Sequence, residues 1–169
     1  MRAAETLALC GALALLLGGP AAAQQPAEQW ITYKNPRFGT TADVPRHLLP
    51  RQLPDPVNGD GRRWSSTDGR ATLAVFGSFN ALELTPERYV EDIHADLLAH
   101  ADYRRTTATW FVISGTKDDV VFYNRCNFTP DLHVQHCIAL SYPASDARAW
   151  DAAVTRISKS LRIGRGLDG

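Results

Sequence analysis

Two histidines in the C-terminal third of the chain are the residues best suited to metal chemistry. His133 and His136 lie close in sequence to Asp131 and Cys137, and histidine and cysteine are good ligands for zinc or copper. A spacing of three along a strand points the two imidazoles to opposite faces, so only a bulge or a turn could bring them together. A Cys137 held in a disulfide could not act as a thiolate ligand. We therefore predict no metal site at these residues.

A second candidate is the segment that ends at Asp60 and Gly61. Oxygen-bearing side chains precede the glycine there, as they do in a calcium-binding loop. If Gly61 takes the sixth position of such a loop, Pro56 takes the first and Thr67 the twelfth, so the bidentate acid is missing. We interpret the segment as a turn closed by its Asn-Gly and Asp-Gly pairs.

Motifs that carry catalytic nucleophiles are not found in the sequence. It contains no Gly-x-Ser-x-Gly, no His-Glu-x-x-His, no Cys-x-x-Cys and no glycine-rich phosphate loop ahead of a helix. Serine and aspartate are plentiful, so a triad assembled from distant residues stays open. A redox role for Cys126 and Cys137 is disfavoured, because catalytic cysteines usually sit at a helix N-terminus that lowers the thiol pKa. We predict no catalytic, cofactor-binding or metal-binding residues and no enzyme activity.

The two cysteines instead belong to the element that organises the chain. Residues 110–142 form three apolar segments rich in Val, Ile, Phe, Tyr and Thr, separated by turn residues at 115–118 and 130–131. This pattern predicts an antiparallel meander. A two-residue loop at Asp131 and Leu132 would place Cys126 directly opposite Cys137, close enough for a disulfide.

The N-terminus predicts export. Residues 7–17 are apolar, a Gly-Gly-Pro break follows, and Ala21-Ala22-Ala23 supplies a signal peptidase site. The apolar run is too short to span a bilayer as a helix. We expect residues 1–23 to be a signal peptide cleaved after Ala23, and the mature protein to be periplasmic. Cys10 leaves with this peptide, and an even pair of cysteines in an exported protein favours a disulfide.

Charge and length limit the remaining function classes. The chain carries 18 basic and 18 acidic residues, and this neutrality argues against nucleic acid or an anionic membrane surface as the main partner. No segment after the signal peptide could cross a membrane. We expect one domain over residues 24–163 and a frayed tail over residues 164–169.

The other elements predict the fold class. Turn signals and apolar alternation indicate strands at residues 30–33, 38–44, 63–66 and 71–76. Thr85-Pro86-Glu87 begins a helix whose apolar stripe is Val90, Ile93, Leu97 and Ala101. Ser145 caps a second helix, which Gly164 ends, with a stripe of Trp150, Val154, Ile157 and Leu161. We predict an α+β fold, in which an antiparallel sheet of six to seven strands carries both helices on one face.

Several short motifs resemble those of small exported alphaproteobacterial proteins of uncharacterised function. They are Trp30-x-x-Tyr33-x-Asn35-x-x-Phe38-Gly39 before a Pro-ended strand, Asn58-Gly59-Asp60-Gly61, Ser66-x-Asp68-Gly69, and Leu140-Ser-Tyr-Pro143 before the last helix. The order of strands and helices over residues 30–163 is similar to the PsbP-like fold, which includes the bacterial DcrB lipoproteins. This resemblance implies an assembly or accessory factor that binds other proteins, and it transfers no functional residue.

Two functional hypotheses follow. The first is a non-catalytic periplasmic protein that binds a protein or another envelope component. The alternative is a small exported enzyme or metal-binding protein that uses Asp60, His133 and His136. A pocket with convergent His and Asp side chains would favour the alternative.

Overall fold

The structure, a computed structural model, describes residues 29–167. The predicted signal peptide and the last two residues lie outside this part. In chain order the elements are β1 (Trp30–Lys34), β2 (Thr41–Pro45), β3 (Arg51–Gln52), β4 (Gly61–Ser65), β5 (Thr72–Phe79), α1 (Pro86–Ile93), α2 (Ala95–Leu98), β6 (Ala101–Thr106), β7 (Trp110–Lys117), β8 (Val120–Phe128), β9 (Val134–Pro143), the 3-10 turn η1 (Ala144–Asp146) and α3 (Ala147–Ser160).

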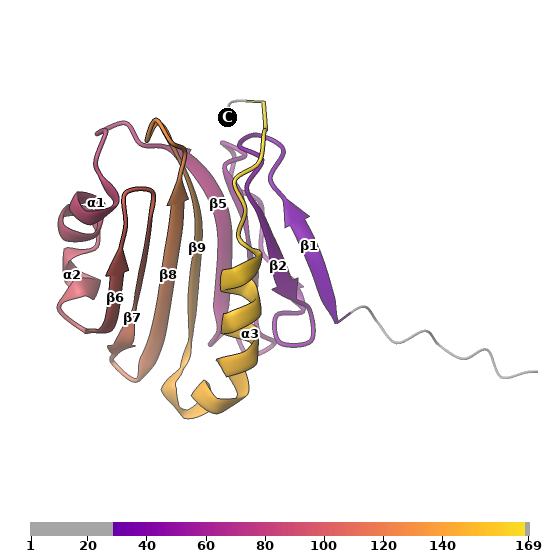
Figure 1. The fold of residues 1–169 in the computed structure, drawn as a ribbon. Coiled ribbons are helices and arrows are strands. Elements are labelled where there is room, and N and C mark those ends of the chain that lie inside the picture. Colours follow the sequence, from indigo (N-terminus) through magenta and orange to yellow (C-terminus); the bar gives the residue numbers. More distant parts are fainter. Residues whose placement is uncertain (1–28, 168–169) are drawn as a thin grey trace, which may run out of the picture.

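Seven of the nine strands form one antiparallel sheet in the order β3-β4-β5-β9-β8-β7-β6, and β1 and β2 form a separate hairpin (Figure 1). The predicted α+β class, the antiparallel sheet and the β7-β8-β9 meander are confirmed. The last strand of the chain, β9, pairs with β5 on one side and β8 on the other. It therefore lies inside the sheet, and nearly all of its residues on both faces are buried or half-buried.

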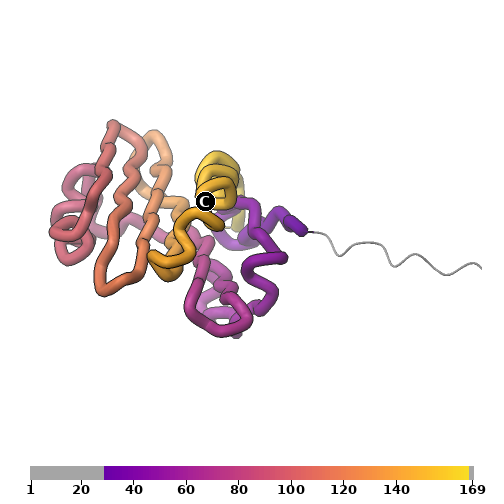
Figure 2. Tube along the Cα trace, turned by 90° about the horizontal axis from the view of Figure 1, so that it is seen from below, coloured from indigo at the N-terminus to yellow at the C-terminus, as the bar shows by residue number. Residues whose placement is uncertain are grey.

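The two amphipathic helices lie on opposite faces of the sheet, which corrects the prediction that they share one. Val90 of α1 packs with Phe111 and Ile113, whereas Trp150 and Ile157 of α3 pack with Leu73, Ile138 and Leu140. Along β8 the disulfide of Cys126 faces the first cluster, and Arg125 reaches the backbone of α3. Figure 2 shows α1 and α2 on one side of strands β6–β8 and α3 on the other. An apolar stripe predicts that a helix packs on a sheet, but not on which face.

The predicted helix after Thr85 is shorter than its apolar stripe. The Thr85 hydroxyl accepts a hydrogen bond from the Arg88 amide at 3.3 Å, as an N-cap should. Helix α1 then ends at Ile93, and one further turn, α2, follows. Ala101, expected to end the stripe, instead begins strand β6, whose backbone pairs with β7. The sequence analysis missed β6 because its residues are exposed and charged.

The end of the chain packs beside α3. Tyr142 stacks on Trp150 with ring centroids 5.0 Å apart. The prediction that Ser145 caps the last helix is wrong, because Ser145 lies in the 3-10 turn η1 and Asp146 occupies the N-cap position of α3. Helix α3 ends at Ser160, before the predicted Gly164. The segment that follows runs along residues 36–41, where the Arg162 amide donates to the Thr41 carbonyl at 2.9 Å and the Leu167 amide to the Pro36 carbonyl at 3.1 Å.

Candidate functional site

The helices on the two faces of the sheet cover different strands, and this leaves a groove open on the face that carries α1 and α2. Helices α1 and α2 pack over β7, β8 and one end of β9 on their face, so in the described residues the other part of that face, around Ala74 and Ala139, has no helix on it. A cavity of about 550 Å³ lies there between α2 and β4. Its lining residues are Arg63, Thr72, Ala74, Leu97, Lys117, Asp118, Val120, Phe122, Asn124, Ala139, Leu140 and Ser141.

The floor of the groove is a row of residues that face one another across four strands. Asn124 on β8 pairs with Ala139 on β9, which pairs with Ala74 on β5, which pairs with Arg63 on β4. The two alanines leave the floor low between larger neighbours. Since neighbouring strands are about 4.8 Å apart, Asn124 and Arg63 lie roughly 14 Å from each other.

Asn124 is the unusual residue of this floor. Its side chain is only 8% exposed and lines the groove, yet within residues 29–167 its carboxamide has no hydrogen-bond partner. The neighbouring polar pair on the floor differs, because the Thr72 and Ser141 hydroxyls bond to each other at 2.9 Å. The polar atoms of Asn124 face the groove and are reached by solvent there, unlike Trp64 Nε1, Gln135 Oε1 and His136 Nε2, which within the described residues are buried without a partner. A carboxamide that can donate and accept is therefore presented to whatever fills the groove.

The charges at the two ends of the groove differ in their pairing. At the α2 end, the Lys117 ammonium donates to the Asp96 carboxylate at 2.6 Å, which lowers the pKa of Asp96 and raises the pKa of Lys117. At the β4 end, Arg63 is exposed and meets no carboxylate in the described part of the chain. A second hollow of about 330 Å³ continues from Arg63 and Ala74 towards Asp60.

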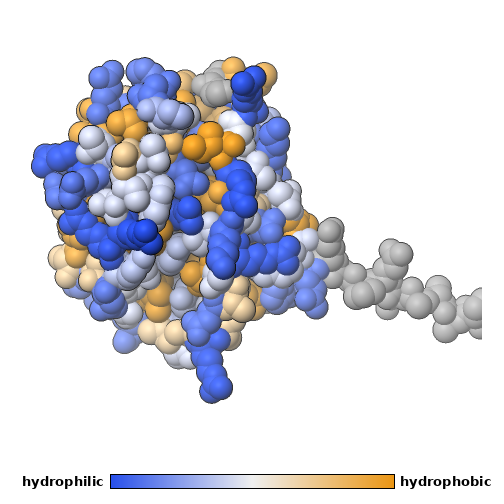
Figure 3. Space-filling view, viewed as in Figure 1, coloured by the Kyte–Doolittle hydropathy of each residue, from blue (hydrophilic) through white to orange (hydrophobic). Residues whose placement is uncertain are grey.

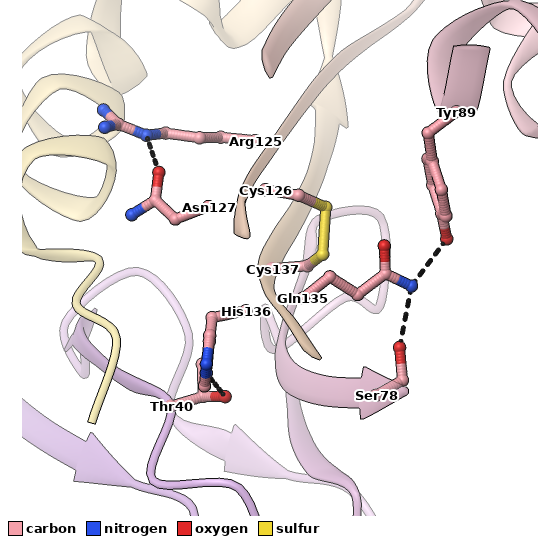
Figure 4. Close-up of a disulfide and its surroundings, with 9 residues drawn as sticks. All are labelled: Thr40, Ser78, Tyr89, Arg125, Cys126, Asn127, Gln135, His136 and Cys137. Carbon is pink, nitrogen blue, oxygen red and sulfur yellow. Dashed lines mark hydrogen bonds between the residues drawn. A yellow bond between two sulfur atoms is a disulfide. The ribbon is translucent and has the colours of Figure 1, made fainter. Parts of the chain in front are cut away.

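The residues of the alternative hypothesis do not meet in one site. Asp60 accepts a hydrogen bond from the Asn58 amide at 2.8 Å in its turn. His133 is exposed in the turn before β9, while His136 is fully buried, with Nδ1 2.8 Å from the Thr40 hydroxyl (Figure 4). Burial lowers the pKa of His136 to about 4. Between residues 29 and 167, no three His, Cys, Asp or Glu side chains are placed to hold a metal ion.

The predicted disulfide is present. Cys126 and Cys137 are directly opposite each other on β8 and β9 and are bonded, with Cα atoms 4.1 Å apart. Figure 4 shows the bridge pointing to one side of the strands while Arg125 and Asn127 point to the other. Both cysteines are buried in the cluster with Phe111 and Phe128, where they fasten β8 to β9 beside the groove.

The sequence analysis did not identify Asn124. The signal that marks it is the alternation along β8, where residues 122, 126 and 128 on one face are apolar and residue 124 is polar. The same strand register sets Asn124 opposite Ala139. A polar residue within an apolar strand face, opposite small residues, is the pattern that could have pointed to this groove.

Among comparisons with known proteins, only that with solved structures bears on the fold. No protein-family model and no curated protein sequence matches the chain. Among solved structures, cyanobacterial PsbP (CyanoP) from Synechocystis sp. PCC 6803 is similar, with a TM-score of 0.53 and 10% sequence identity over 86% of this chain and 99% of that one. The chain therefore has a PsbP-like fold, and at this identity the likeness says nothing of function. In the described residues, no helix is both long and apolar enough to span a membrane.

Proposed function

We propose that this chain is a non-catalytic binding protein of the periplasm, and that the groove over β4, β5 and β9 holds an extended apolar segment of a partner polypeptide. The observation that carries the proposal is the carboxamide of Asn124, which lines the groove floor and, within the described residues, makes no hydrogen bond to the protein. A peptide backbone presents both an N–H and a C=O, which match the acceptor and donor of one carboxamide.

The size and charge of the groove support this occupant. Ala74 and Ala139 leave room for apolar side chains, and Phe122 and Leu97 line the same space. The roughly 14 Å between Asn124 and Arg63 corresponds to about four residues of an extended chain. The guanidinium of Arg63 would then favour a carboxylate at the far end of the bound segment.

Localisation in the periplasm rests on two features. Residues 1–23 have the composition of a signal peptide, and the Cys126–Cys137 disulfide suits an oxidising compartment. Protein purified from the periplasm should begin at Gln24 when its N-terminus is sequenced. An intact Met1 in that fraction would contradict this part of the proposal.

The binding proposal is tested with apolar tetrapeptides that end in either a free carboxylate or an amide. In NMR titrations, the side-chain amide signals of Asn124 should shift with both peptides, and the carboxylate form should bind more tightly. Asn124→Leu should abolish binding of both. Arg63→Gln should lower the affinity for the carboxylate peptide to the affinity for the amidated peptide.

The matched control is Arg148→Gln, which removes an exposed arginine from α3 on the other face. It should leave both affinities unchanged. Signals of Asn124 that do not move, or a folded Asn124→Leu variant that binds as the parent does, would overturn the proposed function.

A further inference from the structure

The face of the sheet that carries α3 has an uncovered part of its own, between α3 and the edge strand β6. A cavity of about 310 Å³ lies there. Its lining residues include three cations and three aromatic rings and no acid: Tyr103, Arg105, Trp110, Val112, Tyr123, Arg125, Val154, Thr155, Ser158 and Lys159. Figure 3 shows this face of the molecule, on which hydrophilic side chains predominate and apolar ones are scattered.

Trp110 is in contact with two guanidinium groups of this cluster. The Arg105 guanidinium is 5.2 Å from the centre of the indole ring, and that of Arg125 is 5.4 Å from it. Both distances are within the range of cation–π attraction, which holds the guanidiniums beside the ring. The two like charges are thereby kept near one another in the absence of a ligand.

Hydrogen bonds to neighbouring side chains and to α3 also hold the guanidinium of Arg125 in place. Its Nη1 donates to the carbonyl and hydroxyl oxygens of Ser158 at 3.2 and 3.1 Å, and its Nε donates to the Asn127 side-chain oxygen at 3.3 Å. The Ser158 hydroxyl is in turn 2.6 Å from the Tyr123 hydroxyl. These bonds leave Nη2 as the part of the guanidinium that can meet a ligand, in an orientation set before binding.

The cations of this cavity have no counter-charge, although the chain as a whole is neutral. In the part of the chain that the structure describes, no carboxylate pairs with Arg105, Arg125 or Lys159. The adjacent Arg104 shows the contrast, because it points to the other face and meets Glu87 at 3.4 Å and Glu91 at 3.3 Å. Three unpaired cations around one hollow repel each other, and an anion between them would remove that cost.

We propose that this cavity, formed by Arg105, Trp110, Arg125 and Lys159, is a binding site for a phosphate group. A phosphate monoester carries a charge of about −1.5 to −2 at neutral pH, which matches three cations better than a single carboxylate does. Guanidinium groups bind its oxygens through paired N–H donors, and the Lys159 ammonium adds a point charge. The site is independent of the groove on the opposite face.

The test uses inorganic phosphate at constant ionic strength, with chloride as the compensating salt. The indole N–H signal of Trp110 should shift saturably in NMR titrations of the purified protein. Arg105→Gln and Lys159→Gln should each weaken phosphate binding about tenfold, the loss of one charge-assisted hydrogen bond. Arg148→Gln, an exposed arginine of α3 outside the cavity, should not change it.

A second arm separates a free phosphate from a lipid headgroup. Co-sedimentation is measured with vesicles of phosphatidylglycerol and of phosphatidylcholine. Binding to inorganic phosphate, or to phosphatidylglycerol vesicles alone, supports the proposal if Arg105→Gln weakens it and Arg148→Gln does not. The proposal is overturned if the protein binds neither inorganic phosphate nor phosphatidylglycerol vesicles. It is also overturned if Arg105→Gln and Arg148→Gln weaken binding equally. These outcomes do not depend on Asn124. A failure of the phosphate-site proposal can therefore be told apart from a failure of the proposed peptide binding in the groove.

Discussion

Two buried asparagines of this protein differ in whether their hydrogen bonds are made. Asn35 is 1% exposed; its amide donates to the Gly59 carbonyl at 2.9 Å, and its oxygen accepts from the Phe38 amide at 2.7 Å. Asn124 is almost as buried and has neither kind of bond within the described residues. The first asparagine holds a loop together, whereas the carboxamide of the second faces the groove and is free to bond a ligand.

Replacing each asparagine by leucine should therefore change stability in opposite directions. Asn124→Leu should raise the free energy of unfolding by about 1 kcal/mol, because an apolar side chain is buried at a position where the asparagine makes no bond to the protein. Asn35→Leu should lower it by about 3 kcal/mol, because the groups that it bonded become unsatisfied. Urea unfolding measures both. A destabilised Asn124→Leu variant would show that its carboxamide already has a partner.

His136 gives the protein a pH-dependent stability. Burial lowers its pKa in the folded state to about 4, whereas in the unfolded chain it is about 6.5. Between these two pH values the imidazole of His136 is protonated in the unfolded state and neutral in the folded state. Stability is therefore complete above pH 6.5 and falls with the pH by about 1.4 kcal/mol per unit, to a loss of roughly 3 kcal/mol at pH 4. Burial lowers the pKa of His94 as well, in the same direction.

Urea unfolding at several pH values between 7 and 4.5 measures this slope. His136→Gln should reduce it, while His133→Gln, a change at an exposed histidine, should not. The aspartates with lowered pKa, such as Asp68 and Asp96, lose their contribution only near and below pH 4. An imidazole of His136 that titrates near pH 6.5 by NMR in the folded protein would contradict the prediction.

Among the elements, the β8–β9 hairpin is the one whose covalent link can be removed cleanly. The Cys126–Cys137 bridge closes a short loop, and on the chain-entropy model this stabilises the fold by about 2–3 kcal/mol. The Cys126→Ala/Cys137→Ala double variant should lose about that amount in urea unfolding while keeping its far-UV circular dichroism spectrum. Peptide mapping of the parent protein without reductant should show the linked pair, and two free alkylatable thiols would rule the bridge out.

The sequence predicts this hairpin better than it predicts the helices, for a physical reason. Turn residues, alternation and the position of Cys126 opposite Cys137 all act within the local chain, so they fix the register of β8 and β9. The face that receives each helix depends on packing between distant residues, and β9 is buried or half-buried on both faces. Likewise, the groove exists only because β4, β5 and β9 lie side by side, which no local pattern states. Asn124 looked like an ordinary strand residue until that row was assembled.

In the whole molecule, the elements packed on the two faces of the sheet cover different strands. Helices α1 and α2 cover the β7 and β8 part of one face, and α3 with the β1–β2 hairpin covers the β4, β5 and β9 part of the other. Each face therefore has an open part: on the α1 side a groove with an alanine floor and charged residues at its ends, and on the α3 side a cavity lined by cations. The arrangement allows two different ligands to bind without competing for the same surface.

The two apolar clusters lie on opposite faces of the sheet but are built on the same strands. Ile138 and Cys137 are neighbours on β9 and belong to different clusters. Because β9 pairs on both sides, loss of either cluster removes a face from the same strands. We therefore expect the two clusters to unfold in one transition.

Matched substitutions test this. Ile113 and Ile157 are both fully buried, one in each cluster, and each change to valine should cost about 1 kcal/mol. The double variant should lose about 2 kcal/mol, since the residues share no contact. All four tryptophans lie on the α3 side of the sheet, Trp64 and Trp150 in its cluster, Trp30 packed against it and Trp110 in the cavity beside α3, so tryptophan fluorescence reports that face while circular dichroism reports the whole sheet. Both signals should shift together in every variant; an Ile113→Val transition seen by circular dichroism but not by fluorescence would mean that the α1 face melts on its own.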